Sequence, residues 1–222
     1  MADILELIKS RRTVRKYLPK YVDWERVSRI LDAGRHAPSS GNVQNWAFIV
    51  VCEADLRKEL AEACLQQWWM TEAPVHIVVL SEPAKAERYY GVRGERLYTI
   101  QNCAAAIENM LLEAHSLGLG TAWVSAFDED AIRRIVRGED FVRPQGVITL
   151  GWPAETPPRP PKYPLEALVY FNSWRNRIKD PARYMRDYSL IIKRNVEAGK
   201  EFLKKTTEKV KEKVKETLGQ KP

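Results

Sequence analysis

The sequence predicts a domain of the α+β or α/β class built around one sheet, and three observations support this prediction. Short runs of β-branched and aromatic residues alternate with stretches of helical spacing between residues 4 and 172. The composition, 45% hydrophobic with seven tryptophans, is sufficient for a substantial core. No internal repeat is visible, and 222 residues suit one large domain or two small ones.

Helices are expected where apolar residues recur at every third or fourth position. The run ILELI opens the chain in this way, and Asp23 precedes the next such stretch as an N-cap, with Pro38 as its stop. The longest helical signal ends before Gly118 and Gly120. The predicted helices after the first span residues 24–37, 56–69, 97–117 and 128–136.

Strands are expected at WAFIVV (46–51) and VHIVVL (75–80), which have the short, β-branched pattern of buried strands. TAWVSAF (121–127) is a strand or a strand that runs into a loop, and GVITLGW (146–152) and LVYF (168–171) are the last two strands. The proline-rich residues 153–164 predict an extended loop. The segment ERYYGVRGERLY (87–98) suits either a lid or a surface connector.

Charge divides the chain into a body, residues 1–172, and a basic C-terminal extension, residues 173–222. The body holds 21 Lys and Arg against 22 Asp and Glu, whereas the extension holds 15 against 7. Apolar residues from Ile192 to Leu218 step by three or four through Lys and Glu, which predicts an amphipathic helix. We expect this helix to dock on the body or on a partner subunit, because interleaved Glu disfavours nucleic acid.

Cysteine and histidine indicate neither a metal site nor a disulfide framework. The cysteines are widely spaced and odd in number, and we interpret them as reduced core thiols. The histidines stand alone, which favours structural roles and leaves a Cys–His pair open. No apolar stretch approaches the roughly 20 residues of a membrane span and no signal-like segment is visible, so a cytoplasmic protein is expected. The residues are Cys52, Cys64, Cys103, His36, His76 and His115.

The heptapeptide RRTVRKY, residues 11–17 and hereafter the basic run, concentrates cationic side chains. In an extended chain Arg11, Thr13 and Arg15 point to one side, and in a helix Arg11 and Arg15 share a face. Two guanidinium groups with a hydroxyl between them suit an anion with several oxygen atoms, above all a phosphate. The alternative is a solvated basic turn.

Neither a glycine-rich nor a P-loop nucleotide motif occurs in the sequence. Four other elements occur in order: RRTVRKY, APSSGNVQNW, LGLGTAWVSAF and GWPAETPPRPPKYPLEALV. With them the chain resembles the FMN-dependent nitroreductase family over roughly residues 4–172. The resemblance implies an α+β fold with a central, mainly antiparallel sheet flanked by helices, here followed by an extra C-terminal helix. It also implies an intertwined homodimer with one FMN at each of two subunit interfaces.

The resemblance assigns the first two elements to the flavin. It implies that Arg11 and Thr13 hold the phosphate and ribityl chain, that Arg15 lies at the pyrimidine edge, and that Arg12 contributes through its backbone. A cation at that edge would stabilise the negative charge of the reduced flavin. The second element would reach the flavin of the other subunit, and its composition also fits an ordinary turn. Its residues are Pro38, Ser39, Ser40 and Asn42.

The later two elements complete the implied site. Ser125 and Ala126 match the place where the family's main chain lies beside the flavin N5, and a plain strand end is the alternative. Lys162 matches a late phosphate-binding cation, and Arg159 is its possible companion.

Two positions depart from the family's pattern. Tyr163 stands where relatives often have a basic residue, and Asn45 replaces a proline, so the details of phosphate contact can differ here. Trp68 and Trp69 fall in the region that lines the substrate pocket in relatives. The alternative for both side chains is packing in the core.

The activity that the resemblance implies is a ping-pong exchange. NADH or NADPH would reduce FMN, leave, and be replaced by an electron acceptor such as a nitroaromatic or a quinone. No side chain is expected to act as an acid or base, because the cofactor does the chemistry. The alternative is a non-catalytic FMN-binding or regulatory module whose basic tail contacts nucleic acid.

Overall fold

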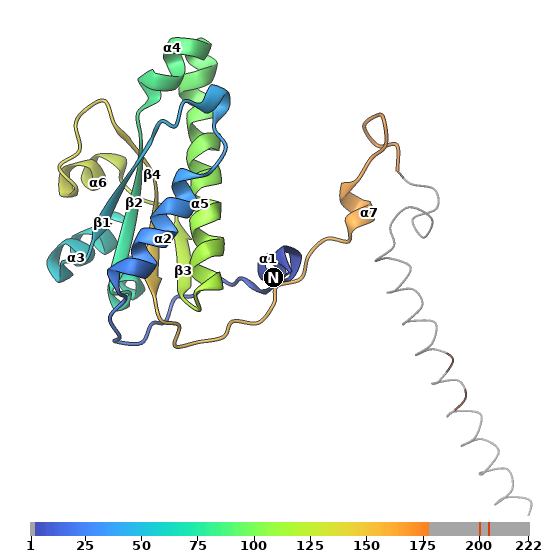
Figure 1. Ribbon diagram of the computed structural model, residues 1–222, viewed down its shortest axis with the longest axis horizontal. Helices are drawn as coiled ribbons and strands as arrows, with labels where there is room; N and C mark the ends of the chain where they lie inside the picture. Colours follow the sequence, from blue (N-terminus) through green and yellow to red (C-terminus); the bar gives the residue numbers. More distant parts are fainter. Residues whose placement is uncertain (1–2, 178–199, 201–203, 205–222) are drawn as a thin grey trace, which may run out of the picture. The chain divides into compact units, whose positions relative to one another are not determined.

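Four strands form the sheet at the centre of the fold (Figure 1). They are β1 (Trp46–Val51), β2 (Val75–Ser81), β3 (Gly120–Val124) and β4 (Arg143–Gly151), in the order β1-β2-β4-β3. Every neighbouring pair is antiparallel, which confirms the α+β class and makes the α/β alternative wrong. The predicted strands at 46–51, 75–80, 121–127 and 146–152 are thereby confirmed in their positions.

The computed structural model describes residues 3–177, 200 and 204. The chain divides into two compact units, Met1–Arg159 and Pro160–Pro222, and the first contains the sheet. The amphipathic helix predicted within residues 192–218 lies outside the described residues, apart from 200 and 204.

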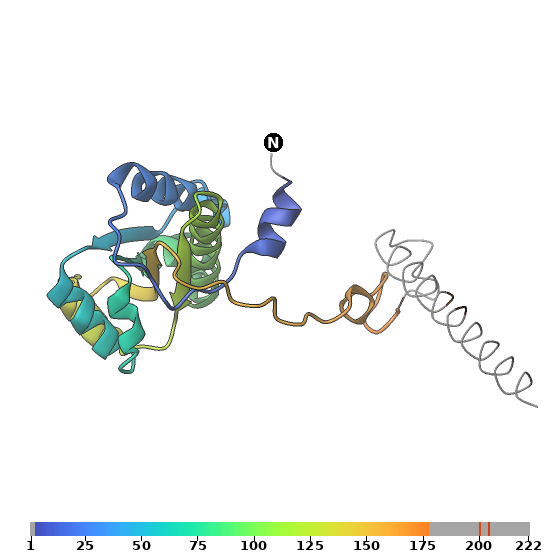
Figure 2. The ribbon, with the colours of Figure 1, turned by 90° about the horizontal axis from the view of Figure 1, so that it is seen from below.

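Helices cover both faces of the sheet (Figure 2). On one face lie α2 (Trp24–Arg35) and α5 (Thr99–Ser116), whose apolar side chains form one core with the strands. On the other face lie α3 (Ala54–Ala63) and α6 (Glu129–Ile135), which form a second core. The strand β2 is therefore buried along its whole length, as its sequence predicts. At the sheet edge β1 is buried only at its two ends, which corrects the prediction of a fully buried strand.

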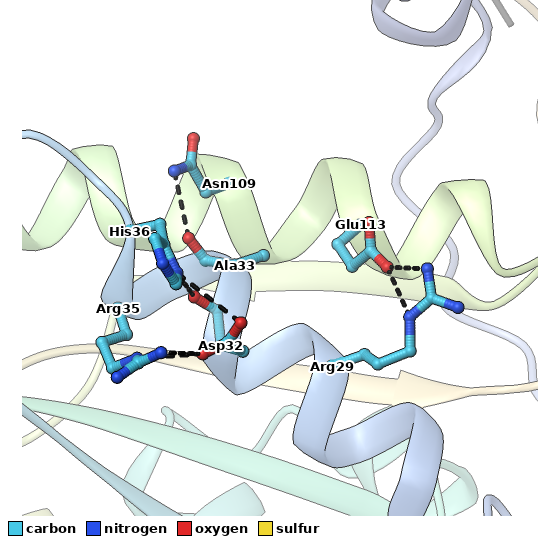
Figure 3. Close-up of polar contacts among 7 residues, drawn as sticks. All are labelled: Arg29, Asp32, Ala33, Arg35, His36, Asn109 and Glu113. Carbon is cyan, nitrogen blue, oxygen red and sulfur yellow. Dashed lines mark hydrogen bonds and ion pairs between the residues drawn. The ribbon is translucent and has the colours of Figure 1, made fainter. Parts of the chain in front are cut away.

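The contacts between α2 and α5 combine an apolar seam with a few polar links (Figure 3). Arg29 donates from Nε and Nη2 to Oε1 of Glu113, at 3.1 and 2.8 Å. Asn109 donates from Nδ2 to the carbonyl oxygen of Ala33 at 3.1 Å. The ion pair is partly exposed and contributes little free energy, so the buried apolar side chains hold the two helices together.

The predicted N-caps are confirmed at two helices. The side chain of Asp23 accepts a hydrogen bond from the Arg26 N–H, and that of Asp128 accepts one from the Ala131 N–H. The long helix α5 ends before Gly118, whose φ of 75° suits a residue without a side chain.

The prediction of one helix over residues 56–69 is wrong. The helix α3 ends at Ala63, because Leu65 and Gln66 adopt left-handed conformations with φ of 59° and 58°. A short 3-10 helix, η2 (Trp68–Glu72), follows. Apolar spacing continues through the break, and for this reason the pattern alone overestimates the length of the helix.

The prediction of a strand at residues 168–171 is also wrong. A single helical turn, α7 (Leu165–Leu168), occupies the start of this region, and the residues after it are irregular. Apolar, β-branched residues form a strand only beside a partner strand, and within the described residues these have none.

Residues 87–98 are helical rather than loop-like. They belong to α4 (Pro83–Arg93) and to a single π-helical turn, η3 (Gly94–Tyr98), which leads directly into α5. The chain kinks at Gly91, with φ of 57° and ψ of −151°. The segment is therefore an ordered helical connection between β2 and α5.

Candidate functional site

The basic run lies along an edge of the sheet. Thr13 forms a bridge with Thr121 at the start of β3, and the N–H of Val14 donates to the Thr121 carbonyl at 2.9 Å. Further along, Tyr17 forms a bridge with Pro153. The run is thus extended, and the solvated-turn alternative does not describe its backbone. The basic run begins directly after the helix α1 (Ile4–Ser10).

A buried tyrosine fixes the far end of the run. The phenol of Tyr17 donates to the Val14 carbonyl at 2.7 Å and shares a second hydrogen bond of 2.7 Å with the Thr149 hydroxyl. Burial raises the pKa of Tyr17 well above its usual value, so the phenol stays protonated. The Tyr17 N–H donates to Oε2 of Glu72 at 3.2 Å. Side chains and backbone together hold the run in place.

The three arginines of the run have different surroundings. Arg12 donates from Nη1 to the carbonyl oxygens of Lys9 and Arg11, at 2.7 and 2.6 Å, so its guanidinium is used within the chain. The guanidinium of Arg15 lies over the ring of Trp69, 5.6 Å from its centroid. No carboxylate of the described residues pairs with Arg11 or Arg15, so both guanidinium groups can contact an anion.

One carboxylate supports the run without neutralising those guanidinium groups. Glu155 accepts hydrogen bonds at Oε1 from the N–H groups of Arg15 and Lys16, at 2.7 and 3.2 Å. Sequence reasoning did not identify Glu155, because it lies 140 positions from Arg15 in the chain. In the sequence Glu155 is visible only as the acidic residue of PAETPP, and no neighbouring residue indicates that it contacts the basic run.

Residues 38–42, hereafter the PSSGN loop, are held by an asparagine of α5. Asn102 accepts at Oδ1 from the Ser40 N–H at 2.9 Å, and donates from Nδ2 to Ser40 Oγ and Asn45 Oδ1, at 3.1 and 2.8 Å. Asn45 in turn donates to the Thr99 hydroxyl at 2.9 Å. Asn45 is fully buried in this network, which accounts for its presence where the resemblance expects proline. A polar residue in the apolar helix pattern was the only sequence signal for Asn102.

The PSSGN loop also needs an unusual backbone. Gly41 and Asn42 have φ of 53° and 58°, in the left-handed region. A Cβ at Gly41 would collide with the hydroxyl of Tyr90 in α4. Glycine at this position therefore lets the loop pack closely on the helix.

The basic run and the PSSGN loop lie toward opposite ends of α5 (Figure 1). His115, in the last turn of the helix, shares a hydrogen bond of 2.9 Å between Nε2 and Ser10 Oγ, next to the run. Asn102 holds Ser40 near the first turn. At 1.5 Å per residue, the stretch of helix from Asn102 to His115 is about 20 Å long. One chain therefore does not bring the two motifs together.

The remaining site candidates are exposed. Ser125 and Ala126 directly follow β3, beyond its buried last residue Val124. Arg159 is the last residue of the first unit, and Lys162 belongs to the second unit. Trp68 is 46% exposed, whereas Trp69 is half-buried against the cluster around Tyr17.

Two of the three cysteines and one of the three histidines are buried. Cys64 and Cys103 are buried free thiols with pKa values raised by burial to about 12, whereas Cys52 is exposed, so the core-thiol prediction is wrong for Cys52. His76 is buried in β2, and burial lowers its pKa to about 4. Burial, followed by the charges of Arg11 and Arg12, lowers the pKa of His115.

Two further searches concern the part of the chain that the structure describes. It contains no group of three or more His, Cys, Asp or Glu side chains arranged to hold a metal ion. None of its helices has the length and apolar character needed to span a membrane.

Comparisons with known proteins identify the family. A model of the nitroreductase family matches residues 8–71 and 67–152. A protein of Methanothermobacter thermautotrophicus, whose name carries both NADH dehydrogenase and NAD(P)H nitroreductase, is 38% identical over 159 residues, which cover 70% of this chain and 80% of that protein. An NAD(P)H FMN reductase of Bacillus subtilis is 24% identical over 190 residues, covering 80% and 76%.

A solved structure supports the same relationship. A nitroreductase family protein from Clostridium difficile 630 superposes with a TM-score of 0.68 at 27% identity, covering 78% of this chain and 100% of that one. The family model, the sequence relatives and the fold agree, and the chain belongs to the nitroreductase family.

Proposed function

We propose that the protein is an FMN-dependent NAD(P)H oxidoreductase that works as a homodimer and transfers electrons to a nitroaromatic or quinone by ping-pong exchange. Membership of the nitroreductase family supports the cofactor and the oxidoreductase activity. The observation that carries the proposal is the basic run, extended along the sheet edge, in which the guanidinium groups of Arg11 and Arg15 pair with no carboxylate of the described residues.

The chemistry of the donor set fits FMN. Arg11 is half-buried and has no carboxylate partner among the described residues, and the Thr13 hydroxyl lies on the same extended strip. A phosphate can accept charge-assisted hydrogen bonds from such a set. The guanidinium of Arg15, steadied by Trp69, would stand at the pyrimidine edge, where it would stabilise negative charge.

The proposed roles of the chain's own residues are binding and orientation. Bound FMN supplies the hydride chemistry by accepting a hydride from the nicotinamide and passing it on. The small side chains of Ser125 and Ala126 would allow the main chain to approach the flavin ring. Arg159 and Lys162 would add positive charge near the phosphate. No acid or base is required of the protein.

The separation of the two motifs along α5 supports the proposed homodimer. In a two-fold pair, the PSSGN loop of one copy could meet the basic run of the other, and Pro38, Ser39, Ser40 and Asn42 would complete the partner's site. This arrangement would use both motifs at one flavin, although a single chain keeps them at opposite ends of a helix about 20 Å long between their anchors.

Reduction of the bound flavin tests the activity. The purified protein should take up FMN, lose its yellow colour when NADPH or NADH is added without oxygen, and regain it with a nitroaromatic or quinone. Initial rates at several acceptor concentrations should give parallel double-reciprocal lines. Intersecting lines would contradict ping-pong exchange. Failure of the protein to bind FMN would contradict the proposed oxidoreductase activity. Titration of the full chain with DNA would then test the nucleic-acid alternative.

Mixing two variants with weakened FMN binding, assayed at a limiting FMN concentration, tests the shared site. Arg11→Ala removes a cation of the basic run, and Asn42→Gly removes an amide of the PSSGN loop while keeping a residue that tolerates the left-handed backbone. Each homodimer would have two damaged sites, whereas a mixed dimer would have one intact site. Unfolding and refolding the two variants together should restore activity. Restoration to no more than the sum of the separate variants would contradict the composite site.

A further inference from the structure

A cavity lies between the PSSGN loop and α4. It has a volume of about 520 Å³, and the end of the loop and the residue after it form one wall. The other wall is a face of α4 that contributes Lys85, Arg88 and Tyr89. The cavity therefore adjoins Asn42, a residue that we assign to the flavin of the partner subunit.

The α4 wall of this cavity carries positive charge. Lys85 and Arg88 are three positions apart and share a helix face. Lys85 Nζ lies 2.6 Å from Glu82 Oε1, whereas no carboxylate of the described residues pairs with Arg88. Residues 83–98 contain four basic and two acidic side chains. An anionic ligand suits this wall better than a neutral one.

An exposed aromatic ring stands beside these cations. Tyr89 is 69% exposed, and its ring centroid lies 6.4 Å from that of Tyr90. The hydroxyl of Tyr90 lies close to Gly41, so the aromatic pair is next to the loop. An exposed ring next to phosphate-binding cations can stack a nucleobase.

We infer that this cavity binds the adenosine phosphate end of the nicotinamide donor. Arg88 and Lys85 contact a phosphate of the donor, and Tyr89 stacks on its adenine. The inference rests on the proposed function, since it requires the nicotinamide to lie on a flavin next to Asn42. From that position the rest of the dinucleotide can extend past the PSSGN loop, because the cavity with its cations adjoins the loop at Asn42.

Steady-state kinetics on FMN-loaded protein tests the inference. Arg88→Gln is compared with wild type and with Arg134→Gln, an exposed arginine of α6 outside the cavity. The donors are NADPH, NADH and N-benzyl-dihydronicotinamide, which has neither adenosine nor phosphate. Arg88→Gln should raise KM for a phosphate-bearing donor about tenfold relative to KM for the benzyl compound. Calorimetric titration with ADP and with adenosine 2′,5′-bisphosphate should show the corresponding loss of affinity.

The three donors separate the outcomes. An equal rise in KM for NADH and NADPH assigns Arg88 to the pyrophosphate, and a rise for NADPH alone assigns it to the 2′-phosphate. Unchanged KM values for both nucleotides, with unchanged binding of the two titrants, would overturn the inference while leaving the oxidoreductase intact. A wild-type protein that none of the three donors reduces would instead overturn the proposed function.

Discussion

The basic run and the PSSGN loop are fixed to the same domain by different means. The run forms backbone bridges with β3 and with Pro153, so most of its side chains are not needed to hold it. The loop depends on the hydrogen bonds of one particular side chain from a distant element, Asn102, and it contains two left-handed residues. Backbone pairing tolerates substitution, whereas a side-chain network fails when one member is lost. The loop should therefore be the more fragile half of the site.

The largest effect is expected when the loop's support is removed. Asn102→Leu leaves the Ser40 N–H and the buried Asn45 Oδ1 without the hydrogen bonds that Asn102 makes with them. We expect the free energy of unfolding to fall by about 2–4 kcal/mol and FMN affinity to fall at least about tenfold. Chemical denaturation and fluorescence titration with FMN measure the two effects.

Asn109→Leu is the matched control for this variant. Asn109 lies on the same helix but donates to the Ala33 carbonyl, away from the loop. It should lose some stability and keep its FMN affinity. Equal FMN affinity in both variants would show that the loop does not depend on Asn102.

A second expected effect is a loss of stability at low pH, caused by a histidine close to the basic run. His76 donates from Nε2 to the Met70 carbonyl, in the same short helix as Glu72 and Trp69, which contact the run. Its pKa is about 4 in the folded protein against 6.5 for the unperturbed group, so the unfolded chain binds more protons between these values. Stability should be complete above pH 6.5 and decline as pH falls toward 4, by about 3 kcal/mol in total.

Urea denaturation between pH 4 and 7.5 measures this loss. His76→Gln keeps an N–H donor for Met70 and should flatten the pH dependence, whereas substitution of the exposed His36 by Gln should not. A pH dependence that is the same in His76→Gln and in the wild type would remove His76 as its cause.

A smaller effect is expected from a single cation of the run. Arg11→Ala would remove the proposed charge-assisted contact to the phosphate, so FMN affinity should fall about tenfold, with stability nearly unchanged because the backbone bridges remain. Fluorescence titration with FMN decides this, with Arg134→Ala as the exposed control. A large loss of stability would contradict the idea that the run is held without the Arg11 side chain.

The smallest effect concerns redox tuning. Arg15→Gln should lower the midpoint potential of bound FMN, because the reduced form loses a fixed positive charge. A loss of about 1 kcal/mol corresponds to roughly 20 mV for two electrons. Spectroelectrochemistry of the FMN-loaded variant measures the shift. A potential equal to that of the wild type would place Arg15 away from the pyrimidine edge.

Sequence patterns predicted the strands, the caps and the family because these depend on neighbouring residues. The short, β-branched run VHIVVL and the carboxylates at Asp23 and Asp128 act locally, and all are confirmed. The end of α3 was missed because left-handed residues at Leu65 and Gln66 leave no mark on apolar spacing.

The supporting residues of the site could not be predicted for a different reason. Asn102 contacts Ser40 across 62 positions, and Glu155 contacts Arg15 across 140. Such pairs depend on how distant elements pack, and a single sequence carries no signal for them. The role of LVYF was misjudged for the same reason, since a strand is defined by its neighbour as much as by its own residues.

The helix α5 has a consequence for how the two flavins of the proposed dimer would influence each other. One end of the helix is linked to the basic run through Ser10, and the other end is linked to the PSSGN loop through Ser40. In the proposed dimer those ends would belong to different sites, so each α5 would be a rod that connects one flavin site to the other. A small shift of the rod on binding the first FMN would change the affinity for the second, and the two α5 helices would give the dimer a mechanical basis for cooperativity.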